Sequence, residues 1–91
     1  MPVSVQLPSA LRPYVGGADS VELDVADVRS ALQGLAGVNA QLYRSICDET
    51  GAVRRHLNLF VNDAHIRDLA GVETQLKNGD TLIILTAVSG G

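Results

Sequence analysis

The last two residues of the sequence, Gly90 and Gly91, could present a reactive group. They follow the apolar run TLIILTAV and one serine, Ser89. A C-terminal carboxylate has an ordinary pKa of about 3.5, so it is ionised at neutral pH, and its delocalised charge makes it a poor electrophile. Glycines have no Cβ and can thread a channel that excludes side chains. The pair could therefore form a slender arm that presents this carboxylate, and the alternative is an ordinary frayed tail.

Other residues with reactive side chains are isolated in the sequence. Cys47 is the single cysteine, which excludes an internal disulfide and a four-cysteine iron–sulfur site, and we expect it to be buried. His56 and His65 have no second ligand at metal-binding spacing and no serine or cysteine partner. We expect structural roles for both and no metal site. Ser89 has no evident base and is expected to be a small residue of the tail.

Length and composition limit the classes of protein. Ninety-one residues allow one domain, and a chain that is 46% hydrophobic but 3% aromatic predicts a small aliphatic core. The net charge is −3 and the arginines are scattered, which disfavours nucleic-acid binding. The N-terminus has no basic leader, and no apolar run approaches the roughly 20 residues of a membrane span. We expect a cytoplasmic protein that does not enter the membrane.

Alternating and helical patterns predict the elements of the first half. Residues 3–7 and 21–25 alternate apolar and polar side chains and predict a hairpin of two strands, joined by a loop rich in proline and glycine. Asp27 is placed to cap a helix whose apolar stripe falls at i, i+3, i+4 and i+7, and Gly37 is expected to end it. The stripe consists of Val28, Ala31, Leu32 and Leu35.

The second half predicts a short helix and three strands. Asn39 can cap a helical segment with Leu42, Tyr43 and Ile46 on one side. Residues 57–61 alternate as a strand, Asn62 and Asp63 form its turn, and Ile66 is expected in a short return strand. Val72 and Leu76 suggest one helical turn. The sequence KNGD then turns into residues 81–88, whose continuous apolar run is typical of a central strand covered on both faces or nearly so.

The order of these elements resembles one known architecture. The order resembles the α+β fold called β-grasp, or ubiquitin-like. It runs strand, strand, helix, strand, short strand and strand, with the most apolar strand last. That resemblance implies a mixed sheet of four to five strands wrapped around one main helix, with the first and last strands parallel. We expect residues 1–87 to form this domain and residues 88–91 to form a flexible tail ending in Gly-Gly.

Four stretches resemble the small sulfur-carrier proteins of the MoaD, ThiS and CysO family. They are LRPYVGG, LNLFVNDAHIR, LKNGDTLIIL and the terminal Gly90-Gly91. The first loop and the VND turn resemble CysO-like and MoaD-like carriers more than the shorter ThiS proteins. Thr86 departs from the family pattern, which often has proline four residues before the glycine pair. The match covers nearly the whole chain.

The resemblance implies a function. An ATP-dependent adenylating enzyme of the MoeB/ThiF type would join the Gly91 carboxylate to AMP, and sulfur would then replace AMP to give a thiocarboxylate. A sulfur-accepting synthase would be the second partner. The chain itself would be a cosubstrate rather than an enzyme, with no bound cofactor. The acceptor stays open among cysteine, molybdopterin, thiamine, tRNA and a thiolated natural product.

The implied fold also suggests which residues contact the activating enzyme. If the first and last strands are parallel neighbours, Arg12, Arg54 and Arg55 lie around the base of the tail and could bind acidic groups of that enzyme. The alternative is an ordinary solvated basic patch. Phe60 alternates with Leu59 and Val61, so it is expected to point outward as a docking residue, with Ser89 also at the interface.

Three other functions remain open from the sequence. A protein modifier would use the same activated Gly91 to form an isopeptide bond with a target lysine, and Lys77 is the single lysine available for chains. A small subunit of a molybdopterin-synthase-type complex would hold its tail permanently in a synthase. A plain interaction module would make no use of the glycines.

Overall fold

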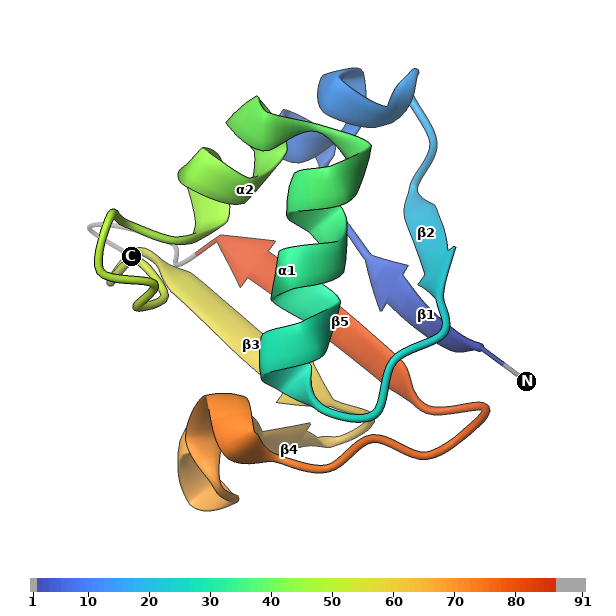
Figure 1. Cartoon of the computed structure of the whole chain (residues 1–91), viewed down its shortest axis with the longest axis vertical. Helices are drawn as coiled ribbons and strands as arrows, with labels where there is room; N and C mark the ends of the chain where they lie inside the picture. Colours follow the sequence, from blue (N-terminus) through green and yellow to red (C-terminus); the bar gives the residue numbers. More distant parts are fainter. Residues whose placement is uncertain (1, 87–91) are drawn as a thin grey trace.

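The computed structural model describes residues 2–86, and its central element is a five-stranded sheet (Figure 1). The strands are β1 (Val3–Gln6), β2 (Ser20–Leu23), β3 (Leu57–Val61), β4 (Ala64–His65) and β5 (Thr81–Thr86). They are ordered β2-β1-β5-β3-β4 across the sheet. β1 runs parallel to β5, and the other neighbours are antiparallel. The mixed sheet, with the last strand in its middle, confirms the β-grasp prediction.

One main helix crosses one face of this sheet (Figure 1). The helices are α1 (Val28–Val38) and α2 (Ala40–Ile46), with 3-10 turns η1 (Ser9–Val15), η2 (Ile66–Asp68) and η3 (Gly71–Glu73). The predicted stripe of α1 is buried throughout. Asp27 caps the helix as predicted, because its Oδ1 accepts a hydrogen bond from the Ser30 N–H at 2.7 Å.

The predicted end of α1 at Gly37 is wrong. The helix continues through Gly37 to Val38 and ends at Asn39, which turns to an extended φ of −161°. The Asn39 side chain then accepts hydrogen bonds from the first backbone N–H groups of α2, at 2.8 and 3.1 Å. One asparagine therefore ends the first helix and caps the second, and this capping stops α1 without a left-handed glycine.

The inner face of the sheet and both helices enclose an aliphatic core. Alternate residues of β1, β3 and β5 point toward α1 and are buried, while their sequence neighbours point to the outer face. Central members of the core are Val5, Leu35, Leu59, Leu82 and Ile84, each 1% exposed or less. The predicted aliphatic core is therefore confirmed.

The structure adds detail near two turns and corrects one prediction there. The predicted loop after β1 contains a 3-10 turn, because residues Ser9–Val15 form η1, with Pro13 inside it and Gly16 closing it at a φ of 69°. Ile66 was expected in the return strand, but β4 ends at His65 and Ile66 begins η2. The helical turn expected around Val72 is present as η3, and Leu76 lies beyond it.

The expectation that β5 is covered on both faces is also wrong. β5 is central within the sheet, but α1 and α2 cover only one face, so Ile83 is half-buried and Leu85 is 45% exposed. The apolar run in the sequence therefore reflects two different environments. One set of side chains forms the core, and the other lies on the open face of the sheet.

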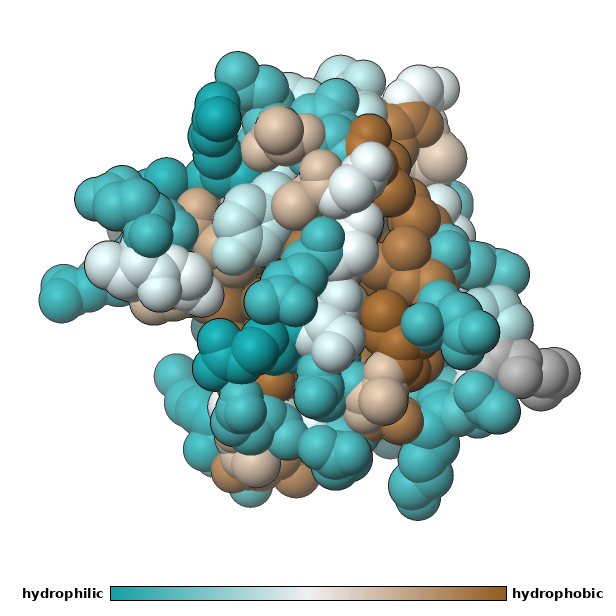
Figure 2. Space-filling view, in the orientation of Figure 1, coloured by the Kyte–Doolittle hydropathy of each residue, from teal (hydrophilic) through white to brown (hydrophobic). Residues whose placement is uncertain are grey.

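On the helical face, an apolar band follows the seam between α1 and β2 (Figure 2). Leu23 of β2 and Val25 pack against the edge of the core here. Gly34 allows the close approach, because a Cβ at this position would lie 3.1 Å from Leu23 Cδ1. The helix and the edge strand thus meet at a position where a small residue is needed.

A hydrogen-bonded turn fixes the start of β5. Asp80 Oδ2 accepts the Lys77 N–H at 2.9 Å, and Asp80 Oδ1 accepts the Asn62 side-chain amide at 3.1 Å. These two donors, the backbone N–H first, lower the pKa of the Asp80 carboxyl. Asn62 in turn accepts the Thr81 N–H at 3.1 Å, which joins the β3–β4 turn to β5.

We expect Asp80→Asn to destabilise the protein at neutral pH and to have little effect in acid. Because the folded-state pKa lies below the unfolded value of about 3.9, the contribution of the carboxylate is complete above that value and is lost as the pH falls through the folded pKa. Urea unfolding of both proteins across this range measures the difference. An equal loss of stability at neutral and acidic pH would contradict the assignment.

Candidate functional site

The predicted working group and its arm lie outside the described residues. These positions are Ser89, Gly90 and Gly91, together with the proposed boundary between residues 87 and 88. The structure describes the platform from which the chain continues, which is the end of β5. Thr86 closes this strand opposite Leu57, at the start of β3. The carboxyl end of β1 is nearby, because Gln6 pairs with Ile83 in the parallel ladder.

The three arginines predicted near the tail flank this end of β5 from opposite sides. Arg12 lies on the β1 side in η1, where its Nε donates to the Leu7 carbonyl at 3.2 Å and it shares a hollow of about 240 Å³ with Leu85. Arg54 and Arg55 precede β3 on the other side. Arg54 Nε donates to the Arg44 carbonyl at 2.7 Å. The structure therefore brings the arginines to one end of the sheet, but in two groups rather than in one cluster.

Phe60 lies on the open face of the sheet within a row of apolar side chains. It is half-buried rather than fully exposed, because its ring packs edge-on against His65 with centroids 5.0 Å apart. The register places Phe60 beside Ile83, and Leu85 follows two residues along β5. We call Phe60, Ile83 and Leu85 the outer apolar row. The sequence suggested only its first member, because residues 82–85 of β5 are apolar at every position and do not distinguish the two faces.

His65 has the structural role expected from the sequence. Its Nδ1 accepts the Arg67 backbone N–H at 3.1 Å, which leaves Nε2 as the protonated nitrogen facing Asn58 Oδ1 at 3.0 Å. These bonds orient the ring against Phe60 and begin η2. In residues 2–86, no group of histidine, cysteine or acidic side chains is arranged to hold a metal ion.

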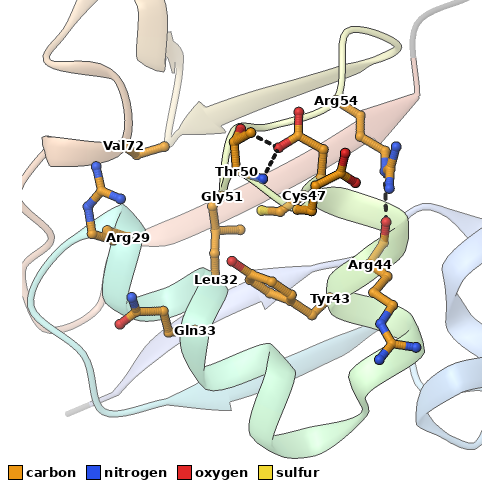
Figure 3. Close-up of a pocket in the computed structure, with 12 residues that line it drawn as sticks. Arg29, Leu32, Gln33, Tyr43, Arg44, Cys47, Thr50, Gly51, Arg54 and Val72 are labelled. Carbon is orange, nitrogen blue, oxygen red and sulfur yellow. Dashed lines mark hydrogen bonds between the residues drawn. The ribbon is translucent and has the colours of Figure 1, made fainter.

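Cys47 lies in the wall of a hollow of about 540 Å³ between the two helices and the following loop (Figure 3). The thiol is 1% exposed, and burial raises its pKa, so the reactive thiolate is disfavoured. Arg54 reaches across to the end of α2, and Thr50 bonds to the Asp48 carboxylate (Figure 3). The expected burial of Cys47 is confirmed.

The fold brings arginine side chains closer together in space than their spacing in the sequence suggested. Four of the six arginines, from α1, the loop before β3 and η2, line one groove beside β3. The fold thus produces a local positive surface on a chain of net charge −3.

The described helices include none that is both long and apolar enough to span a bilayer.

The mixed sheet, the single crossing helix and the central last strand define a ubiquitin-like β-grasp protein. Comparison with known proteins identifies the family: the profile described as ThiS family matches residues 5–91, and the chain belongs to that family. This confirms the family resemblance that the sequence motifs indicated.

Three relatives are similar to this chain over nearly its full length. The sulfur carrier protein CysO of Mycobacterium tuberculosis is 32% identical over the full length of both chains. A chain of the Amycolatopsis orientalis BexX/CysO complex is 37% identical with a TM-score of 0.88, covering 98% of this chain and 99% of that one. The small archaeal modifier protein SAMP1 of Methanosarcina acetivorans is 32% identical with a TM-score of 0.83, covering 99% and 96%. The chain is thus CysO-like, of the sulfur-carrier type.

Proposed function

We propose that this chain carries sulfur as a thiocarboxylate on Gly91. The carboxylate oxygen attacks the α-phosphorus of ATP in an activating enzyme of the MoeB/ThiF type, and pyrophosphate leaves. A sulfur nucleophile then attacks the acyl carbon of the adenylate, and AMP leaves. The sulfur is later transferred to a synthase in a biosynthetic pathway. The observation that supports this proposal is the full-length similarity to the CysO sulfur carriers.

The described surface has features suited to docking such an enzyme. Ordering a tail costs about 1–2 kcal/mol per residue, so the body of the domain must provide most of the binding free energy. The outer apolar row offers apolar area that would lose its water when a partner binds. Arg12, Arg54 and Arg55 can form bidentate bonds to carboxylates. CysO itself is found in a complex with BexX, which supports docking of a partner protein on this chain as well.

We expect Phe60→Ser to slow adenylation strongly while it lowers the stability of the fold only slightly. Loss of a central aromatic contact typically weakens an interface by about 2 kcal/mol, or ~30-fold in the enzyme's KM for the carrier. Arg12→Glu combined with Arg55→Glu should raise KM by a similar factor. It should leave the domain folded, with a loss of about 1 kcal/mol from the hydrogen bond between Arg12 and the Leu7 carbonyl. The matched control is Val38→Ser, because Val38 is 47% exposed on the helical side. Equal kinetics for Phe60→Ser and Val38→Ser would contradict this docking surface.

A direct experiment tests the first chemical step. Radiolabelled pyrophosphate should exchange into ATP only when the purified chain, a MoeB/ThiF-type activating enzyme and unlabelled ATP are all present. Formation of the acyl adenylate is reversible, so the exchange reports activation without any sulfur donor. Failure of exchange with every such enzyme encoded beside the carrier would contradict the proposal.

A second candidate function uses the same activated group. Similarity over nearly the whole chain to SAMP1, a small archaeal modifier protein, favours conjugation of Gly91 to a lysine of another protein. In that case a lysine amine, rather than a sulfur nucleophile, displaces AMP. The two functions differ in product. Conjugation gives isopeptide-linked species of higher mass that resist reducing agents, whereas sulfur transfer returns the unmodified carrier.

A further inference from the structure

A groove of about 520 Å³ lies beside β3, lined also by the start of α1, the loop over residues 50–55, η2 and η3. In Figure 1 these elements surround the lower left of the molecule. Apolar side chains form its floor, among them Leu57, Ile66 and Val72. Its volume lies within the range of about 300–1,000 Å³ that is typical of ligand-binding pockets.

The charged residues that line this groove are all arginines. Arg29, Arg54, Arg55 and Arg67 line it, and none of its lining residues is aspartate or glutamate. Arg29 is neutralised in part by Glu73, at 2.8 Å from Nε to Oε1, with both side chains more than half exposed. Within residues 2–86, the side chains of Arg55 and Arg67 make no hydrogen bond or ion pair. Like charges at close range repel, so the arrangement favours a ligand that brings negative charge.

The adjoining strand edge favours an extended ligand. β4 pairs with β3 only at Phe60 and Val61. Of the described strands, none adjoins Leu57 and Asn58 on that side, and Leu57 and Leu59 lie in the groove itself. The Leu57 N–H already donates to the Arg54 carbonyl at 3.1 Å. A short peptide along this edge would therefore bind mainly through alternate side chains placed into the groove.

The character of the lining favours a peptide over a nucleic acid. Single-stranded nucleic acids are bound by aromatic rings that stack on bases, and the groove contains no phenylalanine, tyrosine or tryptophan. The ring of His65, which also lines the groove, is already packed edge-on against Phe60. Its floor is aliphatic, which suits a valine or leucine side chain. The guanidinium groups of Arg55 and Arg67 suit carboxylates that flank such an apolar residue. Arg29 and Arg54 are already engaged, with Glu73 and with the Arg44 carbonyl.

We propose that this groove binds an extended acidic segment of a partner protein, with one apolar side chain on the floor and carboxylates at the rim. The inference goes beyond the sulfur-carrier function, because it needs no chemistry at the C-terminus. Arg54 and Arg55 could serve both surfaces. Arg29 and Arg67 belong to the groove alone, and Arg67 therefore separates the two proposals.

The test uses the unmodified full chain and a fluorescent synthetic peptide in which a valine–leucine core is flanked by glutamates. Fluorescence anisotropy should show saturable binding that weakens with added salt. Arg67→Glu should weaken binding by about 10-fold or more, since it replaces attraction with repulsion. Lys77→Glu makes the same change of charge on a residue outside the groove, and it should leave binding nearly unchanged. Two further peptides, with glutamine for glutamate or serine for the apolar core, should each bind less tightly.

Three outcomes would overturn the proposal: equal binding by Arg67→Glu and Lys77→Glu, equal binding of the glutamine peptide, or tighter competing binding by a single-stranded RNA oligonucleotide. Pyrophosphate exchange of Arg67→Glu is measured in parallel. Normal exchange with lost peptide binding supports the groove independently of the carrier function. Peptide binding without any exchange in the unmodified chain would leave the groove intact and remove the carrier proposal instead.

Discussion

A single alanine added after Gly91 should abolish both adenylation and thiocarboxylate formation without changing the stability of the domain. The added residue moves the terminal carboxylate by about 3.3–3.6 Å and introduces a Cβ where the proposed channel accepts none. Misplacement of a reacting group by about 1 Å can already cost ~100-fold in rate. We therefore expect activity below about 1% of the unextended chain, measured as pyrophosphate exchange.

The matched control adds one alanine at the N-terminus, before Met1. It should leave exchange unchanged, and urea unfolding of all three chains should agree within about 0.5 kcal/mol. An extended chain that is adenylated at a normal rate would contradict both the narrow channel and the need for glycine as the terminal residue.

Replacing Ile84 by alanine should have the largest effect on stability. Ile84 is fully buried in β5, opposite Leu59 in the antiparallel ladder. Removing a side chain of this size from a packed core costs about 2–5 kcal/mol, against a typical total of about 5–15 kcal/mol for a domain. The substitution should therefore remove a large part of the free energy of unfolding.

The next residue provides the control within the same strand. Leu85 is 45% exposed on the open face, so Leu85→Ala should cost less than about 1 kcal/mol. Urea unfolding followed by circular dichroism measures both values. Similar losses for the two variants would mean that the inner and outer faces of β5 are assigned wrongly. A normal KM of Leu85→Ala for the activating enzyme would in turn argue against the outer apolar row as a docking surface.

The sequence predicted those elements whose local signals agree with their tertiary environment. The stripe of α1, its Asp27 cap and the alternation in β3 each report one buried face, and each is found in the structure. Gly37 failed as a stop signal because capping by Asn39 determines the boundary. The exposed side of β5 could not be predicted, because the core residues Leu82 and Ile84 and the outer residues Ile83 and Leu85 are equally apolar.

The arginine groove was missed for a different reason. Arg29 and Arg67 are far apart in the sequence, and only the packing of α1 and η2 beside β3 brings them to one cavity. Charge counted along a sequence does not report such a local concentration. That the end of β1, the start of β3 and the end of β5 lie at one end of the sheet could be predicted once β1 and β5 were assumed to be parallel. The positions of Arg12 and Arg54 on either side of β5 followed from that topology.

The central claim is that Gly91 carries sulfur, and intact-mass spectrometry tests it most directly. The chain, in a Cys47→Ala background, is incubated with its activating enzyme, ATP and a sulfur donor. We expect a mass gain equal to the exchange of one oxygen for one sulfur, and alkylation by a thiol reagent at the C-terminal residue. The alanine-extended chain should show neither change. An unchanged mass in the unextended chain, under conditions in which adenylation is demonstrated, would contradict the sulfur-carrier function.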